Sequence, residues 1–286
     1  MLRYSFAPDG ALRIEQVRRR PRVYLDHWAL REFSMKPDLG ARLKSALEKH
    51  QGTLVLSLLS WTEFTGITDI GQASAAERFV EGILPRLFFI RFEPWEVLKR
   101  EEAFDAGRTN QAPEGDEQVL ETVAHLPGAG VSGWTIKGIF TEPSTRRDQL
   151  ILTIENFKQA GVEGIRRLRE RLDTEKDVQQ AKRRRLKGLI GVRSATRPLL
   201  WELITELEAN RAAEPTGNDM IDLCHAVVPS AYCDFVLLDR RWHLAVDRAR
   251  ERMLKEGIEA HVARVFSKPH NGIEEFLAAL EAFRPS

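Results

Sequence analysis

The sequence is poor in cysteine and has no long hydrophobic run. Its two cysteines, Cys224 and Cys233, lie nine residues apart, without a CxxC motif or a second pair. This spacing argues against a zinc site and against a disulfide framework, so we expect two buried free thiols. The longest apolar run, residues 53–59, is strand-sized and far below the roughly 18 residues that cross a bilayer. No membrane-spanning segment is therefore expected.

The N-terminus also lacks a signal peptide, because MLRYSFAPDG has neither a basic start nor an apolar stretch. We therefore expect a cytoplasmic protein. With 43% hydrophobic and 30% charged residues, the composition is that of a globular protein and not of a disordered or fibrous one. The net charge of +1 conceals an uneven distribution, since residues 165–193 are basic and residues 93–121 lean acidic.

Short apolar runs alternate with amphipathic segments at both ends of the chain. In the first part, strands are predicted at residues 22–26, 53–60 and 87–92, with helices at 38–50 and 75–83. In the last part, strands are predicted at residues 234–239 and 261–266, with helices at 240–256 and 273–283. This alternation is typical of a doubly wound α/β sheet.

Residues 94–214 interrupt the alternation, because they show helical periodicity and turn-rich breaks but no convincing strand. The clearest amphipathic helices are at residues 150–171 and 198–211. The sequence therefore predicts an α/β domain split between residues 1–93 and 215–286, with an all-helical insertion at 94–214.

Acidic residues follow the predicted strands where each strand ends. Asp26 ends the first strand, Glu63 lies just beyond the second, and Asp239 ends the fourth. The carboxyl ends of parallel strands meet at one edge of a sheet, where open α/β sheets bind ligands. The helix after the insertion adds Asp219 and Asp222, which lie three residues apart on one helical face.

Converging carboxylates repel one another, so they need either protons at raised pKa values or a divalent cation. Oxygen ligands without a His/Cys pattern favour Mg²⁺ or Mn²⁺ over zinc. Such an ion activates water and stabilises the leaving oxygen of a phosphodiester. The candidates for both metal binding and catalysis are Asp26, Glu63, Asp219, Asp222 and Asp239.

Each acid also has a structural explanation. Asp26 and Asp219 could cap helices. Glu63, three residues after Ser60 in SWTE, could complete a capping box. Asp239 could pair with the arginines that follow it. Independent caps have no reason to recur at one edge of successive strands, so the set as a whole favours function.

These segments resemble the four motifs of the PIN-domain nucleases. The motifs are VYLDHWAL with Asp26, LSLLSWTEF with Glu63, NDMIDLCHAV with Asp219 and Asp222, and CDFVLLDRRW with Asp239. The resemblance covers residues 23–92 and 217–266. It implies a PIN-like three-layer sandwich around a parallel sheet, in which three or four acids bind Mg²⁺ or Mn²⁺ and cut RNA.

The sequence departs from the family pattern in two ways, since Leu238 stands where a polar residue often precedes the last aspartate, and the helical insertion is unusually large. The choice between Asp219 and Asp222 stays open. Asp222, 17 residues before Asp239, has the spacing closer to the family's, whereas Asp219 faces the strand ends more naturally. Asp234 opens the fourth strand and is expected at the far end of the sheet.

Candidate substrate-binding residues are basic or lie near the acids. Arg183, Arg184 and Arg185 suit phosphate contacts, or else they belong to a solvated helix face. His27 and His225 could move protons or bond phosphate, although structural histidines are commoner. The tryptophans near the acids, expected mainly in the core, are Trp28, Trp61 and Trp242.

The sequence thus predicts an endoribonuclease that depends on Mg²⁺ or Mn²⁺. The alternatives are a phosphohydrolase acting on DNA or nucleotides, and a catalytically degenerate PIN-like module for binding or assembly. The expected partner is RNA, with DNA as an alternative, and no membrane. The resemblance also leaves open a toxin role with a protein antitoxin, and a homodimer.

Overall fold

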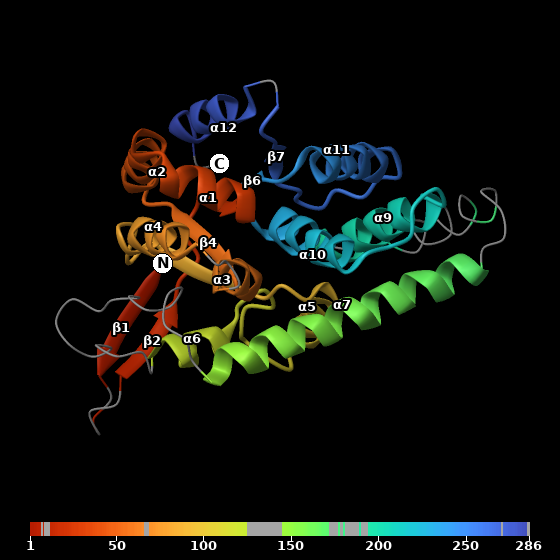
Figure 1. Ribbon diagram of the computed structural model, residues 1–286, viewed down its shortest axis with the longest axis horizontal. Helices are drawn as coiled ribbons and strands as arrows, with labels where there is room; N and C mark the ends of the chain where they lie inside the picture. Colours follow the sequence, from red (N-terminus) through yellow and green to blue (C-terminus); the bar gives the residue numbers. More distant parts are fainter. Residues whose placement is uncertain are drawn as a thin grey trace.

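The computed structural model describes residues 1–6, 8, 12–65, 69–124, 145–171, 177, 180, 189, 194–269 and 271–284 (Figure 1). Arg183, Arg184 and Arg185, the predicted phosphate-binding residues, lie outside the described residues.

A five-stranded parallel sheet with the order β5-β4-β3-β6-β7 lies at the centre of the molecule. The strands are β3 (Arg22–Leu25), β4 (Thr53–Ser57), β5 (Leu87–Ile90), β6 (Phe235–Leu237) and β7 (Arg264–Phe266). The predicted α/β sheet is therefore confirmed. Because β3 pairs with β4 on one side and with β6 on the other, the strand order reverses at β3. The carboxyl end of β3 is the position at which such sheets bind ligands.

Alternate residues along each strand enter two separate cores. Val23 and Leu25 of β3 face one core, whereas Tyr24 faces the other. The first core is covered by α1 (His27–Met35), α2 (Pro37–His50), α4 (Ile70–Glu81) and α12 (Gly272–Glu281). Since helices cover both faces, the strands are mainly apolar, as is typical of buried parallel strands. The result is a three-layer α/β arrangement.

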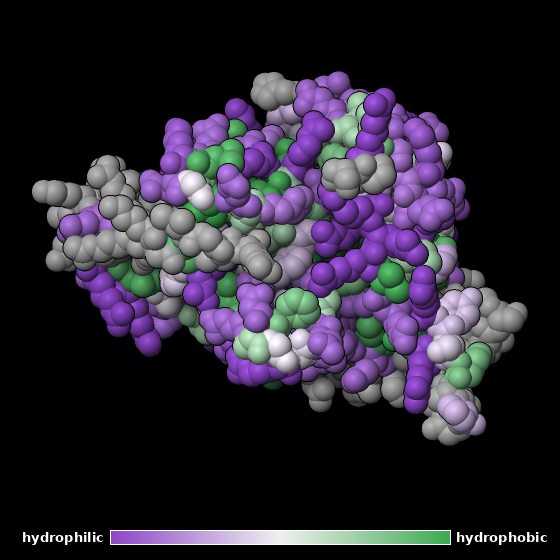
Figure 2. Space-filling view, turned by 180° about the vertical axis from the view of Figure 1, so that it is seen from behind, coloured by the Kyte–Doolittle hydropathy of each residue, from purple (hydrophilic) through white to green (hydrophobic). Residues whose placement is uncertain are grey.

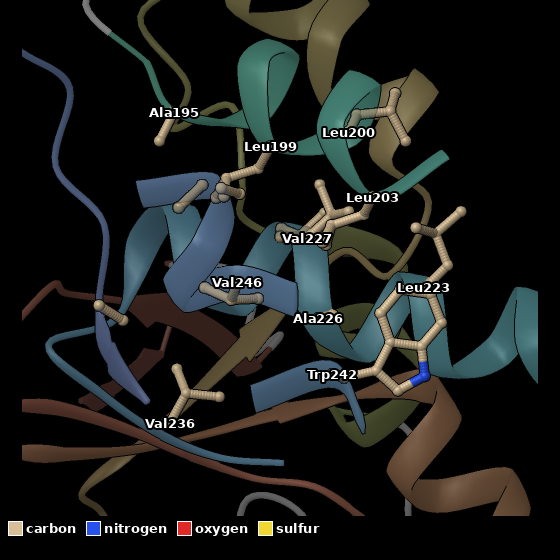
Figure 3. Packing of buried hydrophobic residues seen from close by; sticks show 14 of the residues in the cluster. Ala195, Leu199, Leu200, Leu203, Leu223, Ala226, Val227, Val236, Trp242 and Val246 are labelled. Carbon is tan, nitrogen blue, oxygen red and sulfur yellow. The ribbon is translucent and has the colours of Figure 1, made fainter. Parts of the chain in front are cut away.

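The second core is covered mainly by helices of the predicted insertion and by the helices that follow it. They are α5 (Pro94–Asp105), α7 (Thr145–Arg171), α9 (Thr196–Ala209), α10 (Gly217–Tyr232) and α11 (Arg240–Lys255). Figure 3 shows Leu199 and Leu203 of α9 packed over Val227 of α10. The insertion therefore forms part of one layer of the sandwich, while its exact boundaries at residues 93 and 214 stay a prediction.

Several elements have no counterpart in the sequence prediction or differ from it. Helix α6 (Glu117–Ala124) and an antiparallel hairpin of β1 (Leu2–Phe6) and β2 (Leu12–Gln16) lie beside β5. The Gln16 side chain joins the hairpin to the main chain of Phe89, with bonds of 2.9 and 3.1 Å. The predicted strand at 53–60 ends at Ser57, where α3 (Leu58–Thr65) begins.

The surface is mostly hydrophilic and the two cysteines are buried, as the composition and the cysteine spacing predict. Seen from behind, the molecule is mostly hydrophilic, and hydrophobic residues form small separate patches (Figure 2). None of the helices in the described part of the chain has the length and apolar composition needed to cross a membrane. Cys224 and Cys233 are buried free thiols, as expected.

The packing of α9 predicts that its leucines stabilise the whole molecule. Leu203 is fully buried, so Leu203→Ala is expected to lower the free energy of unfolding by about 2–5 kcal/mol in urea denaturation followed by tryptophan fluorescence. The control Leu254→Ala, at a residue 62% exposed on α11, should change it by less than about 0.5 kcal/mol. An unchanged main transition in Leu203→Ala would mean that α9 unfolds separately from the sheet.

Candidate active site

Asp26 and Asp239 lie at the carboxyl ends of the adjacent strands β3 and β6, and each caps the helix that follows. Asp26 Oδ1 accepts a hydrogen bond from Ala29 N at 3.1 Å, and Asp239 Oδ1 accepts one from Trp242 N at 3.0 Å. The capping explanation for Asp26 is thus confirmed, and Asp239 is also a cap, in place of the expected arginine pair. Each cap engages one oxygen, so capping leaves Oδ2 of both acids for another partner.

Glu63 does not belong to the predicted capping box. Helix α3 begins at Leu58, so Ser60 lies inside its first turn, and Ser60 N donates to Ser57 Oγ at 3.4 Å. Glu63 is carried one turn further and places Oε2 3.2 Å from Nε2 of His225. The two atoms are within ion-pair distance but are not aligned as a hydrogen bond. The capping-box interpretation is wrong because the helix starts earlier than the serine suggested.

His225 lies in the centre of the site and is only 4% exposed. Its Nδ1 hydrogen-bonds to the hydroxyl of Tyr24, which lies 3.1 Å from Ser57 Oγ. Burial alone would lower the pKa of His225, but the negative charges of Glu63, Asp26 and Asp222 outweigh burial, and the pKa is raised. A protonated imidazole would donate Nδ1–H to Tyr24 and direct Nε2–H toward Glu63.

Tyr24 was not among the predicted site residues. Burial raises the pKa of its hydroxyl, which therefore stays protonated and serves as a fixed hydrogen-bond partner for the histidine. The sequence contained a signal for this role, since a tyrosine inside a buried strand needs a partner for its hydroxyl group. Its partner lies 201 residues further along the chain and could not be identified from the strand alone.

Asp222, and not Asp219, is electrostatically coupled to the other acids. Burial raises the pKa of Asp222 to about 6, with His225 opposing the shift and Asp239 and Glu63 adding to it. Asp219 instead forms a capping box with Thr216 and an ion pair with Arg241. These partners outweigh burial and lower the pKa of Asp219. These interactions therefore favour Asp222, the residue with the shorter spacing to Asp239, as the member of the site.

Asp26 is the most deeply buried of the coupled carboxylates. Burial raises its pKa well above the usual range; His225 and Ala29 N oppose the rise, and Glu63 and Asp239 add to it. For Glu63 burial likewise favours the protonated form, but His225 outweighs it and lowers the pKa. We call these coupled carboxylates the acid cluster. Its members are Asp26, Glu63 and Asp222, which all act on His225, and Asp239, which acts on Asp26 and Asp222.

The other residues predicted near the site have mainly structural surroundings. His27 packs edge-on against Phe64 with ring centroids 5.0 Å apart, and burial lowers its pKa. The tryptophans pack in or against the two cores, as expected: Trp28, Trp61 and Trp242. Asp234 lies at the opposite end of the sheet, where it accepts a hydrogen bond from Arg20 Nε at 2.7 Å. Its predicted position away from the site is confirmed.

Three arginines of α7 are engaged in contacts within the protein. Arg167 pairs with Glu163 at 3.0 Å, and Arg166 pairs with Glu214 at 3.4 Å. Arg169 donates to main-chain carbonyl groups near the end of α9. These contacts agree with a solvated and partly structural helix face in this part of the basic region.

The chemistry of the acid cluster suits a divalent cation, although the side chains do not converge on one point. Four carboxylates supply hard oxygen ligands, and the buried Oε2 of Glu63 has no hydrogen-bond partner. Within the described part of the chain, however, no three His, Cys, Asp or Glu side chains are arranged to hold a metal ion. In this conformation Glu63, Asp26 and Asp222 instead face His225, whose pKa they raise.

No family model matches the chain, and comparisons with curated proteins and with solved structures likewise give no match. The resemblance to PIN-domain nucleases stays a prediction that rests on the four motifs.

The opposite pKa shifts of Asp222 and Asp219 predict opposite effects on stability. Because the pKa of Asp222 is raised in the folded protein, its ionisation lowers the stability progressively as the pH rises from the ordinary pKa of 3.8 to about 6, and the full loss is present above about 6. In EDTA at pH 7.5, Asp222→Asn is expected to raise the free energy of unfolding by about 1–2 kcal/mol, and the gain should disappear as the pH falls from 6 to 4.

Asp219→Asn is the matched control, because it should give no gain and should weaken the cap and the Arg241 pair. Urea denaturation at several pH values measures both variants. A loss of stability for Asp222→Asn as large as that for Asp219→Asn would show that Asp222 is not held among like charges.

Proposed function

We propose that this protein is a metal-dependent endoribonuclease whose acid cluster binds Mg²⁺ or Mn²⁺. The observation that carries the proposal is a group of four coupled acids at the edge where the strand order reverses. Asp26, Glu63 and Asp222 act on one buried histidine, and Asp239 acts on Asp26 and Asp222. Two of these acids have raised pKa values, so their charged forms oppose folding. Ionisable groups with strongly shifted pKa values are concentrated at functional sites.

A divalent cation bound by the four carboxylates would activate water and stabilise the oxygen that leaves phosphorus. Asp26 and Asp239 are held in place by their Oδ1 helix caps, and Oδ2 is the oxygen that each would offer. Glu63 would offer Oε2, which in this conformation lies 3.2 Å from Nε2 of His225. The hard oxygen donors favour magnesium or manganese over zinc.

The surrounding protein contributes positive potential and fixed orientation. Helices α1 and α11 begin at Asp26 and Asp239, so their partially positive N-termini lie at the same edge of the sheet and favour an anionic phosphodiester. Tyr24 fixes the ring of His225 through Nδ1, and Nε2 then holds a proton beside Glu63. We assign His225 a positioning role, because it is buried and acts through Glu63.

The proposal predicts that single-stranded RNA is cleaved in the presence of Mn²⁺ and that Asp26→Asn lowers the rate at least about 100-fold, because charge stabilisation in the transition state is lost. Asp219→Asn should stay within a few-fold of the wild type, since Asp219 is bound to Thr216 and Arg241. Gel analysis of a labelled RNA, with DNA and nucleotides as further substrates, measures both. Unchanged cleavage by Asp26→Asn would overturn the proposal.

One observation favours a second candidate, a non-catalytic module for binding or assembly. Three of the acids already face a histidine whose pKa they raise, and the described side chains do not form a metal-binding group in this conformation. Isothermal titration with Mn²⁺ separates the two candidates. The nuclease proposal predicts binding to the wild type and at least about tenfold weaker binding to Asp222→Asn, because one charged ligand is lost. No heat of binding with the wild type would favour the module.

A further inference from the structure

A cleft with a volume of about 340 Å³ lies beside Glu63, between α3, α7 and α10. The three helices lie close together in Figure 1, and α7 contacts both of the others. Apolar side chains from all three helices line the cleft: Leu59, Ile151, Ile154 and Ile221. Its volume is at the lower end of the range for small-ligand sites, about 300–1,000 Å³.

Two glycines hold α7 close to α10 and so fix one wall of the cleft. A Cβ atom at Gly161 of α7 would lie 2.6 Å from the sulfur of Met220, and one at Gly217 of α10 would lie 3.0 Å from Cβ of Lys158. Both distances are shorter than ordinary carbon contacts. The wall that carries Lys158 is therefore set by close helix packing.

The polar side of the cleft joins it to the acid cluster. The side chain of Glu63 lines the cleft and also belongs to the acid cluster. Lys158, paired with Glu155 at 2.6 Å, places an ammonium group at the same cleft, and its charge reaches Glu63. The apolar wall suits a base, and the lysine next to the carboxylates suits a phosphate. This order matches the alternation of base and phosphate along a single strand of nucleic acid.

We infer that this cleft is a subsite for one nucleotide of a single-stranded nucleic acid, with the base between the apolar side chains and an adjacent phosphate on Lys158. The inference rests on the proposed function, because it assigns the cleft to the substrate of the same site. Apolar side chains hold unstacked bases in other binding pockets, and a lysine contact to phosphate gives salt-dependent affinity.

The test measures binding without cleavage. Fluorescence anisotropy follows a fluorescein-labelled single-stranded RNA of six nucleotides with the full chain in EDTA. Ile151→Asp places a negative charge on the apolar wall and is expected to weaken binding at least tenfold. Leu152→Asp is the matched control, because Leu152 is exposed on the same helix and does not line the cleft. Its affinity should stay within about twofold, since rim charges act only through screened electrostatics.

Lys158→Met tests the phosphate contact separately. Binding should weaken about three- to tenfold at low salt, and the slope of log affinity against log salt concentration should become less negative by about 0.7, which corresponds to one phosphate on a single strand. Lys99→Met is the control, because Lys99 has a comparable i,i+3 pair with Glu96 on α5 but does not line the cleft. Thermal denaturation of each variant checks that it is folded.

Equal affinities of Ile151→Asp and Leu152→Asp, an unchanged salt slope in Lys158→Met, or no binding of the RNA by the wild type would each overturn the inference. Failure of this inference and failure of the nuclease proposal give different experimental results. Weakened binding in the cleft variants without any Mn²⁺-dependent cleavage would support the subsite and reject the nuclease. Cleavage with unchanged binding in both variants would support the nuclease and reject the subsite.

Discussion

The contact between His225 and Glu63 is the interaction on which the site depends. Four carboxylates, two just after β3 and β6 and two on α3 and α10, lie within electrostatic reach of one another, and their repulsion opposes folding wherever water is excluded. His225, whose pKa these carboxylates raise, lowers this repulsion when it is protonated, and it lowers the pKa of Glu63. Tyr24 makes the arrangement specific, because its hydroxyl fixes the ring from the central strand.

Capping and function are compatible at this edge of the sheet. A strand that leads directly into a helix places its last residue at the N-cap, where a carboxylate meets unpaired amide groups. Asp26 and Asp239 use one oxygen in this way, and the positive helix end stabilises the charge on the whole group. Asp219 differs because Thr216 and Arg241 engage both of its oxygens.

The sequence predicted the elements whose side chains are buried on both faces, since continuous apolar runs such as residues 53–57 are typical of central parallel strands. It did not predict the β1–β2 hairpin, although apolar and polar residues alternate in β1 (LRYSF) and in β2 (LRIEQ); the first strand is nevertheless exposed along most of its length. The sequence also allowed Asp26, Glu63 and Asp239 to be grouped, because each follows a predicted strand. The choice of Asp222 and the central place of His225 depend on Tyr24 and Glu63, and these tertiary contacts leave no trace in local spacing.

Helix α10 connects the chemistry of the acid cluster with the cleft beside it. It places Asp222 and His225 among the carboxylates, while Asn218 and Ile221 line the cleft. Its first turn is held by the capping box at Thr216 and by close contact with α7. Because one rigid helix carries both sets of side chains, a displacement of α7 at this contact would move the cleft and the cluster together. Helix α7, which lies between β5 and β6 in the chain, therefore acts on the site through packing, as one wall of the cleft and as a close neighbour of α10.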